Sequence, residues 1–307
     1  MCGPECQGGY SLPGLMRDYG TEEQCRQALF QWRWPKGYIC THCESTQYCR
    51  AQVSSHLPVQ SLPPSTIINQ WHYLRFNQAA SNHLVSSYLT NNSSKTGLSA
   101  LALRRQLGVS YNTAWAMKQK IMQVMKERDD SRPLTGVIQL DDVYWGGEHH
   151  GGKPGRGSPN KTPFVAAVSS DVDGHPQRMN MNVVKGFRLK EIERWEKRHL
   201  TPNSHVVSDG LACFTAVTKA QCKSTGGGPA CVSLREFTWV NTMIGNVKNA
   251  ITGVYHSIDH RHLPRYLAEY RYRFNRRFDL TALLPRFCYV ALRTPSMPAR
   301  LLSLAEG

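Results

Sequence analysis

The sequence lacks a long hydrophobic run, and no segment approaches the roughly 18 consecutive apolar residues of a membrane-spanning helix. Residues 1–10 also lack the basic stretch and apolar core of a secretory signal peptide. These two absences argue against a membrane-embedded or an exported protein. We therefore expect a cytoplasmic protein that has no membrane partner.

Acidic residues are scarce relative to basic ones. The chain has 37 Lys and Arg against 22 Asp and Glu, which gives a formal net charge of +15. Such an excess favours a polyanionic partner, most simply nucleic acid, although a basic cytosolic protein without one is the alternative. With no export signal, the ten cysteines indicate thiols or metal ligands and not disulfides.

The sequence also lacks a second, closely spaced cysteine pair. Cys40 and Cys43 have the two-residue spacing of half a zinc ribbon, in which two thiolates share a tetrahedral Zn²⁺. A closed site needs another pair about 15–20 residues later, and the nearby Cys49 and His56 are poor substitutes. Cys40 and Cys43 are therefore predicted to be the ligands of an incomplete Zn²⁺ site.

Two stretches have the features of DNA-binding segments. Residues 97–127 carry apolar residues at helical spacing, interrupted at Gly108, and Ser110 is placed to cap a second helix. This pattern predicts a helix-turn-helix, with a plain two-helix hairpin as the alternative. The flexible loop 151–157 could contact phosphates, or it could be a disordered tip. The basic residues that we expect to face outward and bind DNA are Arg104, Arg105, Lys118, Lys120, Lys153 and Arg156.

Two apolar, β-branched stretches end abruptly in acids. Residues 137–147 place Asp141 and Asp142 before a glycine pair, and residues 205–210 place Asp209 before a glycine. Each pattern predicts a buried strand that delivers a carboxylate to the edge of a sheet. The alternative for each is an Asp that merely starts a turn.

The C-terminal third adds an amide and several charges. Asn241 could cap a helix, and Lys248, seven residues later, would share its helix face. Glu269, Arg273 and Arg276 recur at helical spacing, for which an ion-paired helix face is the simplest interpretation. Two carboxylates and an amide oxygen are hard ligands suited to Mg²⁺.

Together these residues resemble a bacterial insertion-sequence transposase of the DD(E/N) type. The chain is similar to the ISXO2-like group, which has an N-terminal zinc ribbon and a ribonuclease-H-like core. The resemblance covers almost the whole chain except about residues 53–89. It rests on the following segments: Tyr19 to Cys25, Arg33 to Pro35, Leu107 to Trp115, Asp141 to Gly147, Asp209-Gly210, Asn241-Thr242, Gly245 to Lys248, Gly253 to His256 and Tyr266 to Arg277.

The resemblance implies an α/β (α+β) fold in which a mixed-sheet core follows two smaller modules. The expected parts are a degenerate zinc-ribbon-like module at 1–52, an irregular segment at 53–92, helix-turn-helix-like helices at 93–130, a ribonuclease-H-like core at 135–290 and a tail at 291–307. The expected location is the bacterial cytoplasm, in association with the nucleoid.

The resemblance also assigns a function. The protein would bind double-stranded DNA at terminal inverted repeats and at a target, as a homo-oligomer, and would cleave and transfer strands with Mg²⁺ or Mn²⁺. The implied metal ligands are Asp141, Asp209 and Asn241, and the further implied catalytic residues are Lys248, Glu269, Arg273 and Arg276. An inactive remnant that only binds DNA is the alternative. A regulatory zinc-ribbon factor is disfavoured because it would not need the Asp, Asp, Asn, Lys series.

Residues 53–89 depart from the family pattern, which has the second cysteine pair there. Read one base later, the codons of Asn69 through Ser87 permit Ile-Ser-Gly-Thr-Ile-Phe-Asp-Ser-Thr-Lys-Leu-Pro-Leu-Thr-Thr-Trp-Phe-Leu, which resembles the family. Those beginning at Leu57 permit Tyr-Gln-Cys-Asn-Arg-Cys, with thiols overlapping Val59 and Leu62.

Agreement over so long a run is not expected by chance. Our hypothesis is that two compensating frameshifts bracket the segment, one before about His56 and one near Leu89. The N-terminal module would then have lost half of its zinc site. Since structural zinc contributes folding energy to such a ribbon, the module is expected to fold poorly.

Overall fold

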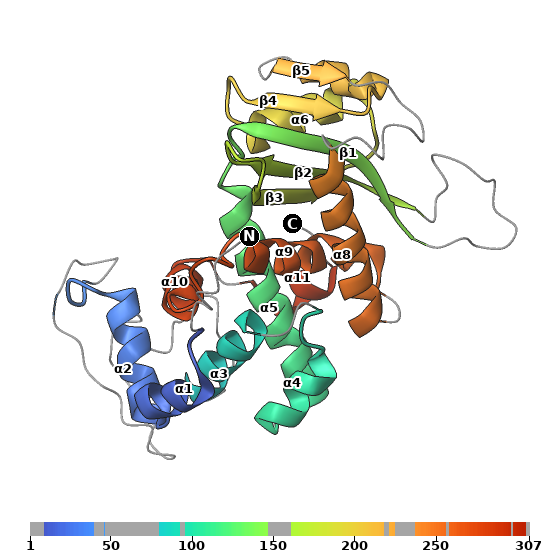
Figure 1. Cartoon of the computed structure of the whole chain (residues 1–307). Helices are drawn as coiled ribbons and strands as arrows, with labels where there is room; N and C mark the ends of the chain where they lie inside the picture. Colours follow the sequence, from blue (N-terminus) through green and yellow to red (C-terminus); the bar gives the residue numbers. More distant parts are fainter. Residues whose placement is uncertain are drawn as a thin grey trace, which may run out of the picture. The chain divides into compact units, whose positions relative to one another are not determined.

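The computed structural model describes residues 9–39, 46, 80–92, 96–146, 161–217, 221–224, 237–255, 258–295 and 297–304 (Figure 1). Its contacts divide the chain into two units. The helical unit takes in the described residues of Met1–Asn92, Ala100–Ile121 and Asp279–Ser303. The sheet unit takes in those of Ser93–Ser99, Met122–Phe278 and Leu304–Gly307. The predicted core reached residue 290, whereas residues 279–290 cluster with the helical unit.

The helical unit is built from short helices. They are α1 (Leu12–Tyr19), α2 (Glu22–Arg33), α3 (Ala80–Asn91), α4 (Ala100–Leu107), the beginning of α5 (Tyr111–Asp130), α10 (Leu283–Ala291) and most of α11 (Ala299–Leu304). Helix α2 begins with a capping box: Gln24 N donates to Thr21 Oγ1, and Thr21 N donates to Gln24 Oε1. No helix of the described residues combines the length and the apolar character needed to cross a membrane.

Helix α3 corrects one expectation. Residues 53–92 were predicted to be irregular, but residues 80–91 form a helix, whereas 53–79 lie outside the described residues. Its first N–H groups are bound by a carboxylate from α2, because Glu22 accepts from Ala80 N at 2.7 Å and from Ser81 N at 2.9 Å. Glu22 caps α3 through backbone N–H groups, so this cap does not depend on the side chains of α3. The helix therefore forms although its side chains show only a weak helical pattern.

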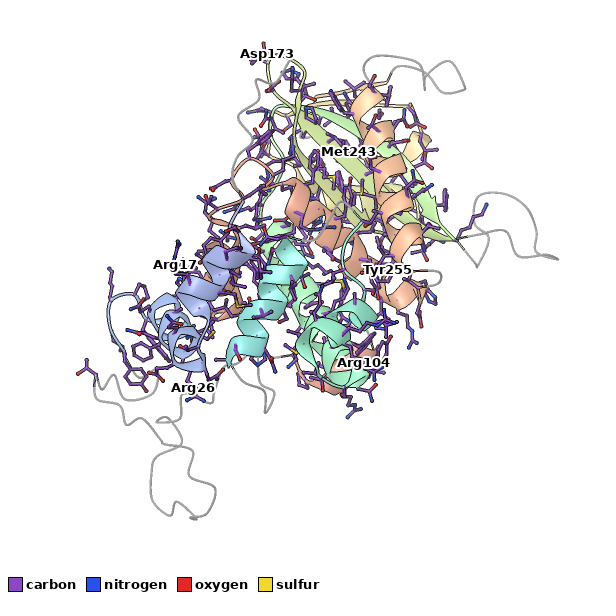
Figure 2. All side chains as sticks on the ribbon, turned by 60° about the horizontal axis from the view of Figure 1, so that its bottom comes forward. Arg17, Arg26, Arg104, Asp173, Met243 and Tyr255 are labelled. Carbon is purple, nitrogen blue, oxygen red and sulfur yellow. The ribbon has the colours of Figure 1, made fainter. Side chains whose placement is uncertain are left out.

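The two helices predicted within residues 97–127 are present as α4 and α5, with the predicted turn between them. Gly108 adopts φ +67° between α4 and α5, a conformation that favours glycine, and Ser110 Oγ accepts from Thr113 N at 3.2 Å. Arg104 and Arg105 are exposed on α4, as expected (Figure 2, which labels Arg104).

The outward position predicted for Lys118 and Lys120 is wrong. Their exposed fractions are 2% and 3%. The apolar pattern predicted a helix with one solvent face, but α5 is buried on all sides from Met117 to Met125. A helix buried all round leaves no outward face for its basic residues.

The sheet unit contains one five-stranded sheet in the order β3-β2-β1-β4-β5. Its strands are β1 (Val137–Trp145), β2 (Thr162–Ser170), β3 (Pro176–Val183), β4 (His205–Ser208) and β5 (Gln221–Ser224). β2 runs antiparallel to both of its neighbours, β1 and β3, whereas β1, β4 and β5 pair in parallel. This arrangement confirms the α/β class and the mixed sheet expected of a ribonuclease-H-like core.

Helices cover both faces of the sheet (Figure 1). The helical segments of this unit are α6 (Leu189–His199), η1 (Ala212–Ala216), α8 (Thr238–Val254), η3 (His260–His262) and α9 (Leu263–Phe274). Alternate residues of β2 show the division: Phe164 and Ala166 pack with α8 and α9, whereas Val165 and Ala167 pack with α6 and η1. On β1, Val143 joins the α8 side and Leu140 the α6 side.

The outer edge of β3 is occupied by side chains that follow or belong to α9. The Asn275 side chain accepts from Met179 N at 2.8 Å and donates to Met179 O at 3.0 Å. Arg277 Nη1 donates to Gln177 O at 3.1 Å, and its Nη2 donates to Pro176 O. Backbone groups that an edge strand normally exposes are thus already hydrogen-bonded.

Candidate metal centre

The register of two parallel strands brings the predicted acids together. Leu140 of β1 pairs with Ser208 of β4, and the next residue along the chain is in each case an aspartate, Asp141 or Asp209. Asp209 follows the end of β4, whereas Asp141 lies within β1, which continues past the predicted end to Trp145. Equivalent positions on neighbouring parallel strands lie side by side, so the register brings the two residues next to each other. Asp209 Oδ1 also accepts from Leu211 N at 3.1 Å, which holds the turn after β4.

A third carboxylate joins them. Oxygen atoms of Asp141, Asp142 and Asp209 all lie within 4.8 Å of one another, and each side chain is partly buried. Asp142 was expected only as an acidic neighbour of Asp141, so the sequence prediction omitted one possible ligand. Three hard oxygen donors at this spacing fit a divalent cation of the Mg²⁺ or Mn²⁺ type.

The electrostatics of Asp141 agree with that fit. Burial, followed by the charges of Asp142 and Asp209, raises the pKa of Asp141 from its usual 3.8 to about 6. A hydrogen bond from Asp142 N, 2.9 Å long, and the charge of Lys248 act in the opposite direction. A partly buried group of like charges is unfavourable until a cation neutralises it.

The raised pKa gives a prediction for the metal-free protein. The unfolded carboxyl ionises near pH 4 and the folded one near pH 6, so stability is lost as pH rises through 6. Asp141→Asn removes this loss and should stabilise the chelator-treated protein at pH 7. The expected gain is limited to roughly 1–2 kcal/mol, because solvent screens part of the repulsion between the carboxylates. Urea unfolding at pH 4 and pH 7 measures it. The exposed Asp173→Asn is the control, and a gain independent of pH would contradict the assignment.

Helix α8 carries the predicted Asn241 and Lys248. The alternative that Asn241 caps this helix is excluded, because α8 begins three residues earlier, at Thr238. Lys248 lies two turns further along the same helical face, and its charge reaches Asp141. Of these two residues, Lys248 is the one whose charge acts on Asp141.

Glu269 and Arg273 of α9 lie beside Gly97, in the segment that precedes α4. Glu269 is 3% exposed, and a Cβ added at Gly97 would come within 3.2 Å of its Oε1 and 3.4 Å of Arg273 Nη2. Beside them, Tyr255 Oη donates to Leu98 O at 3.1 Å. Burial, and then the charge of Glu269, raises the pKa of Tyr255. Glu269 and Arg273 thus leave little room for a side chain at Gly97, and Tyr255 binds the next residue, Leu98.

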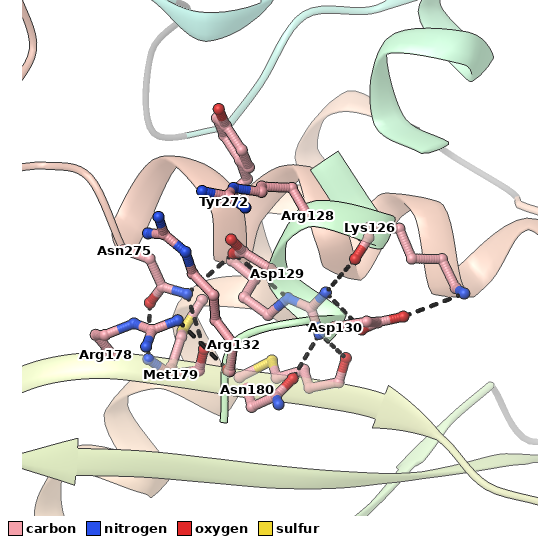
Figure 3. A network of polar contacts seen from close by, with 12 residues as sticks. Lys126, Arg128, Asp129, Asp130, Arg132, Arg178, Met179, Asn180, Tyr272 and Asn275 are labelled. Carbon is pink, nitrogen blue, oxygen red and sulfur yellow. Dashed lines mark hydrogen bonds and ion pairs between the residues drawn. The ribbon is translucent and has the colours of Figure 1, made fainter. Parts of the chain in front are cut away.

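Arg276 belongs to a buried polar network around Asp129. Figure 3 shows such a network and labels Asp129, Asp130 and Tyr272. Arg276 Nη2 lies 2.7 Å from Asp129 Oδ1, and its guanidinium stacks on Tyr272 at 3.4 Å. In the same network Arg271 binds Asp130 at 2.8 Å and also donates to Asn180 Oδ1. These contacts join the end of α5 to α9 and β3. Arg276 follows the end of α9 and pairs with α5, so it does not form the ion-paired face along one helix that its spacing indicated.

The remaining predicted residues lie outside the described part of the chain. They are the candidate zinc ligands Cys40 and Cys43 and the candidate phosphate contacts Lys153 and Arg156.

The sequence prediction also missed a residue near the metal centre, Gln139, whose side chain binds the first turn of α8. A lone polar residue within an apolar strand was the available signal, because buried polar groups need partners.

The sheet and its carboxylates define a ribonuclease-H-like core with a candidate divalent-metal centre. Residues 133–275 match the ISXO2-like transposase domain, and residues 20–54 match the transposase zinc-ribbon domain. These two matches identify an insertion-sequence transposase domain of the ISXO2-like type preceded by a transposase zinc-ribbon domain. No curated protein matches the chain.

Proposed function

We propose that the protein is a DD(E/N) transposase that binds element ends and catalyses metal-dependent DNA cleavage and strand transfer. The observation that carries the proposal is the cluster of Asp141, Asp142 and Asp209, whose oxygens lie within 4.8 Å inside the matched transposase domain. Carboxylates that the sheet register brings together suit a metal-dependent phosphodiester reaction better than a structural role.

In this proposal Asp141 and Asp209 hold the metal, and Asn241 completes the ligand set through its amide oxygen. Bound Mg²⁺ or Mn²⁺ would activate a water or a 3′-hydroxyl and stabilise the leaving oxygen. Asn241 is neutral, but Asp142 brings the number of clustered carboxylates to three. Lys248 would contact a DNA phosphate near the reacting bond. Its positive charge would reduce the repulsion between that phosphate and the clustered carboxylates.

Helices α4 and α5 would provide part of the DNA-binding surface. In helix-turn-helix proteins the N-terminal residues of the second helix reach base edges, and here Tyr111 and Asn112 at the start of α5 are exposed. Arg104 and Arg105 are suited to phosphates. Lys118 leaves this set because it is buried. An element has two ends to cut, so we further propose a homo-oligomer on DNA.

The described helix α3 supports the frameshift hypothesis. It buries His83, Ser86 and Ser87, polar residues that are uncommon in a helical core. Ser86 Oγ and Ser87 Oγ both donate to the His83 carbonyl of the same helix. In the shifted frame this helix would carry Trp-Phe-Leu. The zinc-ribbon match also ends at residue 54, close to the proposed first shift.

The test of the proposed function is cleavage of DNA that carries the terminal inverted repeats of the element. With Mg²⁺ or Mn²⁺ the purified chain should nick the repeat boundary and join the freed 3′-hydroxyl to a second duplex. Sequencing gels that resolve nicked and joined products measure both steps. Specific repeat binding with no cleavage in either metal would favour the alternative, a transposase remnant that only binds DNA.

A further inference from the structure

Gln139 is a buried polar side chain within the apolar part of β1, and it is 7% exposed. Its Oε1 accepts two hydrogen bonds from the backbone of α8, from Trp239 N and from Val240 N, each 3.0 Å long. These N–H groups belong to the first helical turn, where an N–H has no partner within the helix. One side-chain oxygen thus fastens the beginning of α8 to β1.

The fastened face of β1 is the one that bears Asp141. Side chains two residues apart on a strand share a face, so Gln139, Asp141 and Val143 project to the same side. Val143 packs in the apolar cluster that contains Val240 and Val247 of α8. Asp141 therefore lies between two β1 residues that pack on this helix or bind it.

The fastened turn of α8 is the one that bears Asn241. Asn241 follows Val240 directly, so the backbone held by Gln139 leads straight into it. A second contact holds the same turn, because Trp239 Nε1 donates to Gly174 O at 2.7 Å in the turn between β2 and β3. The start of α8 is thus fixed from two parts of the sheet.

We infer that Gln139 is a positioning residue for the metal centre, which sets Asn241 of α8 against Asp141 of β1. The inference rests on the proposed function. A neutral amide performs this task without placing another negative charge beside Asp141, Asp142 and Asp209. Residues that orient metal ligands typically change metal affinity by about 10–100-fold when they are replaced.

The test uses Mn²⁺ as the probe, with free Mn²⁺ measured by electron paramagnetic resonance on the full chain. Gln139→Met keeps the length of the side chain but offers no acceptor, and should raise the Mn²⁺ concentration for half-saturation at least about tenfold. Gln139→Glu keeps an acceptor oxygen for both N–H groups, so its half-saturation should stay within about threefold of wild type or fall below it.

A matched control separates positioning from general stability. Gln123 is equally buried, at 4% exposed, and its Oε1 accepts from Arg265 Nε at 2.9 Å. Gln123→Met should lower the melting temperature and leave Mn²⁺ half-saturation unchanged. If Gln139→Met does not fold, Gln139→Asn supplies the measurement, because its shorter amide cannot reach both N–H groups and should weaken Mn²⁺ binding.

The outcomes are distinct. Folded Gln139→Met or Gln139→Asn protein that binds Mn²⁺ as wild type does would overturn the inference and leave the proposed function standing. Equal weakening in Gln123→Met would overturn it as well, because the effect would then be general. Wild-type protein that neither binds Mn²⁺ nor cleaves repeat DNA would overturn the proposed function and the inference with it.

Discussion

Asp141→Asn is expected to slow metal-dependent DNA cleavage at least roughly a thousandfold, which corresponds to about 4 kcal/mol of transition-state stabilisation. The substitution removes the carboxylate that stands between Asp142, Asp209 and the charge of Lys248. Binding of duplex repeat DNA should stay within about threefold, because this half-buried side chain belongs to the aspartate cluster and DNA affinity comes mainly from phosphate contacts. Single-turnover cleavage and gel-shift titration measure the two quantities.

The matched control for this prediction is Asp173→Asn. Asp173 is exposed in the turn between β2 and β3, and the substitution makes the same change of charge and shape away from the cluster. Its cleavage rate should equal that of wild type. Cleavage by Asp141→Asn at a rate near wild type would refute the assignment of Asp141 to the metal centre.

Repair of the proposed frameshift is expected to restore a zinc site. A chain that carries the shifted-frame residues from about His56 to Leu89 would have a second cysteine pair, at the positions of Val59 and Leu62. With Cys40 and Cys43 it should bind one Zn²⁺ with about 10 kcal/mol or more of free energy, a dissociation constant in the nanomolar range. Competition with a chromophoric chelator measures the affinity, and the present chain should bind Zn²⁺ far more weakly.

Two results would count against the repair hypothesis. The first is a gene whose shifted frame does not encode the missing residues. The second is a repaired chain that binds no zinc. Cys40→Ser in the repaired chain is the control, since loss of one of four ligands should abolish tight binding while metal-dependent behaviour of the aspartate cluster stays unchanged.

The two strands could be predicted from the sequence because their signal is local. An apolar run before Asp141 and another before Asp209 each identify a strand, but the predicted end at Asp141 is wrong, because β1 continues to Trp145. The pairing of Leu140 with Ser208 could not be predicted in the same way, because residues so distant in sequence become neighbours only through the sheet. The assignment of Asp141 and Asp209 to one site therefore came from the family resemblance.

The wrong outward position of Lys118 and the omission of Gln139 have a different cause. Periodicity shows which positions of a helix are apolar, but it does not show that other elements cover the polar positions as well. Lys118 is buried for that reason. Gln139 was overlooked because its partners, Trp239 N and Val240 N, are backbone groups about a hundred positions away, and no sequence pattern identifies a backbone partner at that distance.

The occupied edge of β3 limits how copies of this protein can assemble. A strand arriving from another chain would have to displace the bonds that Asn275 makes to Met179 and that Arg277 makes to Gln177. Sheet-to-sheet extension across this edge, which also underlies much aggregation, is thereby disfavoured. Copies gathered on two element ends are therefore expected to meet through side-chain surfaces or at the opposite end of the sheet, beyond β5.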